Sequence, residues 1–199
     1  MVRTVIGGLV AGVIIFVMAF IFWASPLGAI AFTKTSDAQV AAVHTSLAQN
    51  LTQSGTGTYL IPDPGSREGA ALYARGPVAT VTFNAGGFSP EDMSALLPGI
   101  ILAVATGLLM SFGLAGFGGG RGFADAARLV VLYTLGIALW ECLTNPIFGH
   151  ADWRFWIYSL VATAITFIVP GLVIARWFLP AAHSAAYRET PAAEANETV

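Results

Sequence analysis

Four side chains that could transfer protons or bind a ligand lie close together in the sequence. Glu141 lies within three residues of the end of a long apolar segment, and His150, Asp152 and Arg154 follow in a short loop. An acid deep in a membrane segment is costly and usually faces a bundle interior or water. An acid near the end of the segment reaches headgroup water at little cost. The position predicts an interfacial polar cluster, with a functional Glu141 as the alternative.

Other catalytic interpretations do not fit the spacing. The His, Asp and Glu residues match no zinc pattern, so we expect no metal and no cofactor. The glycine-rich run Gly116–Gly122 lacks the preceding strand and the Gly-Lys-Ser/Thr ending of a phosphate loop, and it predicts a flexible cytoplasmic hairpin. Cys142 has no recognisable set of His and Asn partners. We therefore expect that the protein is not an enzyme.

Composition indicates that lipid is the main solvent of this chain. Of its 199 residues, 56% are hydrophobic and only 10% are charged, against about 25% charged residues in an ordinary soluble domain. The formal net charge of −2 provides no basic field for a phosphate backbone. Nucleic acid is therefore not expected as a partner, whereas the lipid bilayer is.

Four apolar stretches approach or meet the length of a membrane span. A hydrocarbon core about 30 Å thick needs roughly 20 apolar residues in a helix, and apolar runs in lipid form helices because each backbone amide must be paired internally. Arg3 and the segment Ala29-Ile30-Ala31 resemble parts of a cleavable signal peptide, but the first apolar run is too long, which favours a retained anchor. The predicted spans are Val5–Trp23, Leu96–Leu114, Ala126–Leu143 and Phe155–Trp177.

The predicted fold is an α-helical membrane protein, a four-transmembrane-helix bundle with a small extracytoplasmic α+β module between helices 1 and 2. In the module, Ser36 and Gln39 predict a capping box before an amphipathic helix that ends near Gln53. Short strands are expected over 58–61 and, after Gly76-Pro77, through Phe83. The predicted divisions are an N-terminal anchor over 1–32, the module over 33–90, a three-helix membrane region over 91–180 and a disordered cytoplasmic tail over 181–199.

The distribution of arginine predicts the orientation. Short loops rich in Lys and Arg stay in the cytoplasm, and more arginines fall on the side of the two termini. Tryptophans near the predicted span ends fit the headgroup layer. We expect a multi-pass protein of the bacterial inner (cytoplasmic) membrane, with both termini cytoplasmic and residues 33–90 periplasmic. The arginines on the cytoplasmic side are Arg3, Arg121, Arg128, Arg176 and Arg188.

Small residues recur at every fourth position of the second predicted span. Helices in lipid associate with little hydrophobic drive, so small residues that let backbones approach are important. The first span carries Gly8 and Gly12 at the same spacing. The pattern predicts packing within the bundle, with self-association or docking on a larger complex as the alternative. The stripe on the second span comprises Gly99, Ala103, Gly107, Ser111 and Ala115.

Two prolines fall inside predicted spans, where each removes a backbone donor. Pro98 lies within the first turns after Ser89-Pro90-Glu91-Asp92, which has the composition of a helix start. Pro170-Gly171 lies deeper, where it indicates a kink or, alternatively, a transporter hinge.

The order of elements resembles a group of small, uncharacterised bacterial inner-membrane proteins. In that group an anchor is followed by an amphipathic periplasmic helix, a Tyr-x-x-Pro strand, a Gly-Pro strand and three more spans. This chain has Ser25-Pro26-Leu27-Gly28 where the group carries a Trp-His element. The resemblance implies a location and an architecture, and no activity is carried over with it. The matching residues are Ser54-Gly55, Tyr59-Leu60-Ile61-Pro62-Asp63-Pro64 and Gly76-Pro77-Val78.

These patterns favour a non-catalytic membrane protein that works by contact. It would act as an accessory or structural subunit of a larger membrane complex, or as a small homo-oligomer. The alternative is a small-solute or ion transporter or channel, with Pro170-Gly171 as the hinge and Glu141 as the coupling group. Coupled carriers normally keep acids near the bilayer midplane, and the sequence places none there.

Overall fold

The computed structural model describes residues 1–89, 92–118 and 122–179, and it is mostly helical. The chain divides into two compact units. The helical unit comprises Met1–Thr33 and the described residues from Ser94 onward, and the insert unit comprises Lys34–Met93. The predicted tail over 181–199, with Arg188, and the predicted hairpin residues 119–121 lie outside the described residues.

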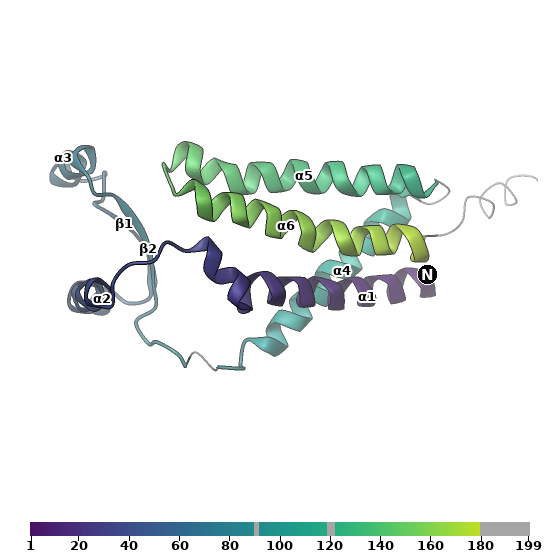
Figure 1. Cartoon of the computed structure of the whole chain (residues 1–199), viewed down its shortest axis with the longest axis horizontal. Coiled ribbons are helices and arrows are strands. Elements are labelled where there is room, and N and C mark those ends of the chain that lie inside the picture. The colour runs from purple at the N-terminus through teal and green to yellow at the C-terminus, as the bar shows by residue number, and fades with distance from the viewer. Residues whose placement is uncertain (90–91, 119–121, 180–199) are drawn as a thin grey trace, which may run out of the picture. The chain divides into compact units, whose positions relative to one another are not determined.

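Four long helices form the helical unit, and each is long and apolar enough to cross a membrane, as the sequence predicted. α5 and α6 lie side by side, while α1 packs against both α4 and α6 (Figure 1). α1 continues as a π-helical turn, Phe20–Ala24, and α6 continues as another, Ile174–Phe178. The four helices are α1 (Val2–Ala19), α4 (Leu96–Gly118), α5 (Phe123–Phe148) and α6 (Trp153–Val173).

α4 begins where the predicted span begins and extends past the predicted end of that span. α4 begins at Leu96, so Pro98 lies in its first turn, where a missing N–H breaks no helical bond. Of the expected helix start near Ser89, Pro90 and Glu91 lie outside the described residues. At the other end, α4 runs on to Gly118 rather than ending at Leu114, so part of the predicted glycine hairpin is helical.

α5 runs past its predicted end, through Pro146 to Phe148. Thr144 and Asn145 directly follow the predicted end at Leu143. Their side chains donate to the backbone carbonyl of Glu141 within the helix, at 3.4 and 3.2 Å. Such local bonds satisfy polar side chains without ending a helix.

In its described residues, the insert unit has two short antiparallel strands and two α-helices, and Tyr59 pairs with Val81 at the centre of the strand register. The predicted capping box is confirmed, because the Ser36 backbone N–H donates to the Gln39 side chain at 3.1 Å and Gln39 N–H donates to Ser36 Oγ at 3.4 Å. The elements are α2 (Asp37–Leu51), a 3-10 turn (Thr52–Ser54), β1 (Gly57–Ile61), α3 (Arg67–Arg75) and β2 (Ala79–Phe83).

α3 was not predicted, because the sequence around it is rich in helix breakers. Ser66 caps it by accepting from the Gly69 N–H at 2.9 Å. A Cβ at Gly69 would lie 1.8 Å from the Asp63 carbonyl oxygen, so only glycine fits this close approach. The helix ends at Gly76, whose φ of +66° favours glycine. Ser66 and Gly76 therefore cap the ends of α3, and Gly69 allows its close packing against Asp63.

Candidate functional site

The small-residue stripe lies in a seam between α1 and α4, where the two backbones touch. A Cβ at Gly12 would lie 2.5 Å from Val104 Cα, and a Cβ at Gly8 would lie 2.7 Å from Leu108 Cα. A Cβ at Gly107 would lie 2.4 Å from both the Gly12 nitrogen and the Gly8 carbonyl oxygen. These contacts are with backbone atoms, which cannot rotate away. Glycine at these three positions is therefore required for the approach.

The remaining stripe residues extend the seam. Ala103 and Ser111 are buried, and Ser111 Oγ donates to the Thr4 carbonyl oxygen at 2.7 Å. Gly99 and Ala115, at the two ends of the stripe, are half-buried. The structure thus places the centre of the stripe inside the helical unit, away from its outer surface.

The four residues of the sequence-predicted polar cluster lie at the end of α5 and the start of α6. Asp152 caps α6 by accepting from the Arg154 N–H at 3.1 Å. His150 has a φ of +50° in the turn between the helices, and Glu141 is exposed on α5. Within the described ranges, no hydrogen bond or ion pair joins the four side chains, and no group of three potential metal ligands is found.

Pro170 and Gly171, the sequence-predicted hinge, are both buried in α6. A Cβ at Gly171 would lie 2.5 Å from Val130 Cγ1 on α5. Because Gly171 has no side chain, α6 can pack closely against Val130 of α5 at this point.

An aromatic cluster joins the end of α1 to the start of α6, and sequence reasoning did not foresee it. Tyr158 Oη donates to the Phe22 carbonyl oxygen at 2.5 Å, and the Tyr158 ring lies 5.4 Å from that of Trp23. Tryptophans at predicted span ends were the only signal in the sequence, and they did not indicate which helices meet. The cluster comprises Phe22, Trp23, Phe32, Phe155, Trp156 and Tyr158.

Two arginines lie at the opposite end of the helical unit. Arg3 Nη2 donates to the Trp177 carbonyl oxygen at 2.8 Å. The Arg176 guanidinium lies 5.9 Å from the centre of the Phe123 ring, at the start of α5. Arg3 and Arg176, two of the arginines that the positive-inside rule assigned to one side, therefore lie at one end of the helical unit. Arg121, also assigned there, lies outside the described residues.

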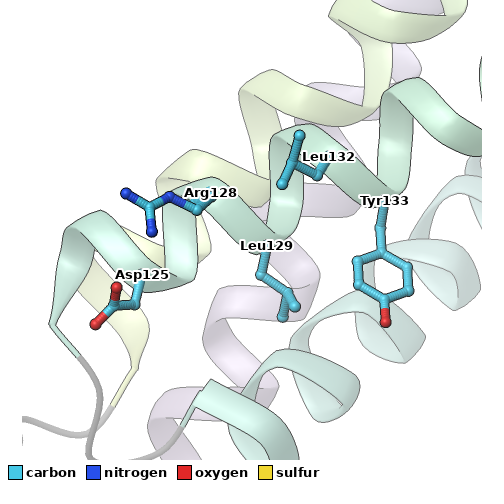
Figure 2. Close-up of a pocket in the computed structure, with 5 residues that line it drawn as sticks. All are labelled: Asp125, Arg128, Leu129, Leu132 and Tyr133. Atoms are coloured by element: carbon cyan, nitrogen blue, oxygen red, sulfur yellow. The ribbon is translucent and has the colours of Figure 1, made fainter.

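A groove runs between α4 and α5 on the outer surface of the helical unit. It has a volume of about 730 Å³ and is lined almost entirely by apolar side chains, together with Tyr133 and Thr134. A shallower pocket of about 350 Å³ shares Leu129 and Tyr133 with it and is also lined by Asp125 and Arg128 (Figure 2). Sequence reasoning missed the groove, because it depends on how far α4 and α5 separate.

No protein-family model matches this chain, and no curated protein or solved structure matches it significantly, so its function must be inferred from its own residues.

Proposed function

We propose that this protein lies in a bacterial inner membrane as four spans, with both termini cytoplasmic and the insert unit periplasmic. The four apolar helices support insertion. Arg3 and Arg176 lie at the same end of the helical unit, near the start of α5, and Arg128 follows in the second turn of that helix. Short loops with such residues remain in the cytoplasm.

Cysteine labelling tests this orientation. The native Cys142 is buried inside α5, so single cysteines can be introduced at the exposed positions Val2 and Gln49. We expect a membrane-impermeant maleimide to label Gln49→Cys in cells with a permeabilised outer membrane, and Val2→Cys only after the inner membrane is broken. The unsubstituted protein serves as the background control. The opposite labelling pattern would refute the proposed orientation.

We propose that the protein works by contact and without catalysis, as an accessory subunit of a membrane complex or as a small homo-oligomer. The supporting observation is the shortage of core in the insert unit, where Gly69 is the only buried residue among those described. Val40 and Val43 lie on one face of α2 and are 53% and 58% exposed. Exposed apolar patches often mark interaction sites. A second protein surface would cover this face and supply the missing burial.

A charge placed on this face should disrupt the assembly. We expect Val43→Glu to reduce the mass of the gently extracted complex to that of the single chain, because a buried unpaired carboxylate strongly disfavours an interface. Ala42→Glu is the matched control, since Ala42 is also exposed on α2 but points away from the Val40–Val43 face. Mass measurement in mild detergent gives the readout. Equal masses for the two variants, or a single-chain mass for the unsubstituted protein, would exclude the contact function.

A further inference from the structure

β2 has one open edge. Within the described residues it pairs only with β1, and no other backbone hydrogen bond joins it to a described part of the chain. Alternate residues of such an edge strand present an unpaired N–H and C=O on the open side. A two-stranded sheet is marginally stable in water, and three or more strands are needed for independent stability. The sheet of the insert unit therefore has a place for a further strand.

A hollow of about 380 Å³ lies between β2 and α2. Three consecutive residues, Val81, Thr82 and Phe83, line it. Because consecutive side chains of a strand point to opposite faces, a hollow lined by all three follows the strand backbone and not one face of the sheet. The other wall is one face of α2, where His44 and Leu47 lie three residues apart. α2 thus leaves space beside the strand.

β2 carries none of the residues that protect an edge strand from pairing. Natural edges are protected by charged side chains, prolines or bulges. The segment Val78–Phe83 contains no charge, proline or glycine, and all its residues except Ala79 are β-branched or aromatic. Such segments favour pairing with another strand. β1 differs, because it begins with Gly57 and is followed directly by Pro62. The open edge of β2 is therefore the better site for strand addition.

We propose that this edge pairs with the same edge of a second copy of the chain, in antiparallel register about Val81. This inference rests on the proposed contact function and names its partner. The two small sheets become one sheet of four strands, in the order β1–β2–β2–β1. Centring the register on Val81 pairs all five residues of β2, so that Thr80 of each copy lies opposite Thr82 of the other.

The charges of the insert unit favour a second copy over an unrelated partner. In a two-fold interface each surface meets its own image, so like charges within it would oppose pairing. β2 is uncharged, and α2 carries one carboxylate, Asp37, and no Lys or Arg. A surface with so few charges offers little by which to select a foreign protein. Threonine pairs, which Thr80 and Thr82 form twice in this register, stabilise neighbouring strands.

Cysteine cross-linking in isolated membranes tests the pairing. Residues directly opposite in an antiparallel pair have Cα atoms about 4.5–5.5 Å apart, within reach of a disulfide. We expect Val81→Cys to give a disulfide-linked dimer on mild oxidation of the full chain. Ala79→Cys is the matched control on the same face of the strand, because the two copies of residue 79 are about 14 Å apart along the strand. It should cross-link at least about tenfold less. The unsubstituted protein, whose Cys142 is buried, gives the background.

Two exposed positions test the register without changing Val81. Thr80→Cys and Thr82→Cys, carried on differently tagged chains in one cell, should form a mixed dimer, because these residues lie opposite each other in the proposed pair. Either variant alone places its two cysteines two residues out of register, about 7 Å along the strand, which exceeds the reach of a disulfide. We therefore expect little cross-linking of either variant with itself.

Two kinds of result would overturn the proposal, and the mass in mild detergent separates them. If Val81→Cys and Ala79→Cys cross-linked equally, or if neither did so and the mixed threonine pair also failed, the edges would not pair. Should the extracted complex then still exceed the mass of one chain, the contact function would stand with another partner or surface. A single-chain mass without any cross-link would remove both the edge pairing and the contact function.

Discussion

Replacing Gly107 by leucine should lower the free energy of unfolding by about 3 kcal/mol, the upper part of the usual range for overpacking a filled core. The reason is that even a Cβ at this position would lie 2.4 Å from the backbone of both Gly8 and Gly12. No rotamer of the new side chain relieves a contact between its first carbon and a neighbouring backbone. α1 and α4 would have to separate along the seam. Thermal unfolding of the purified protein in detergent measures the loss.

Gly116→Leu is the matched control on the same helix. A Cβ at Gly116 meets nothing within 4 Å, and leucine has a higher helix propensity than glycine by roughly 0.8 kcal/mol. We expect an unchanged or slightly raised melting temperature for this variant. If the two variants melted at the same temperature, the backbone contact between α1 and α4 would be refuted.

The elements that could be predicted from the sequence are those with a local signature. The four long helices follow from apolar length alone, because a backbone in lipid has few other ways to pair its amides. The capping box at Ser36 and Gln39 depends on residues three positions apart. The stripe around Gly107 identified a close-packed face, since side-chain size at helical spacing can be read directly from the sequence.

Features that depend on two distant segments could not be predicted. The stripe that contains Gly107 could pack against any of the other helices. Only the fold shows that Gly8 and Gly12 of α1 lie against Gly107. The need for glycine at position 69 could not be inferred either, because only the fold brings the Asp63 carbonyl oxygen against it. Asp125 and Arg128 can be read from the sequence, but the pocket that they line and the apolar groove next to it are tertiary properties.

Tyr158→Ala should lower the free energy of unfolding by about 3 kcal/mol, the lower end of the usual cost of removing a packed aromatic ring. Tyr158 is half-buried, with its ring centre 5.4 Å from that of Trp23 and 6.4 Å from that of Phe22. Its hydroxyl also satisfies the Phe22 carbonyl at 2.5 Å. This carbonyl lies near the end of the first span, and the residue four positions later is Pro26, which supplies no N–H. The truncation therefore removes ring contacts and leaves a backbone acceptor without its partner.

Two further variants separate these contributions. Tyr158→Phe keeps the ring and removes the hydroxyl, so we expect a loss of about 1 kcal/mol, the usual net worth of one hydrogen bond. Phe148→Ala removes a ring that is 73% exposed on α5, and it should change the stability by less than about 0.5 kcal/mol. If Tyr158→Ala and Phe148→Ala unfolded at the same temperature, the aromatic cluster would not hold α1 against α6. If Tyr158→Phe alone accounted for the full loss, the stability of this junction would come from the bond to the Phe22 carbonyl and little from ring packing.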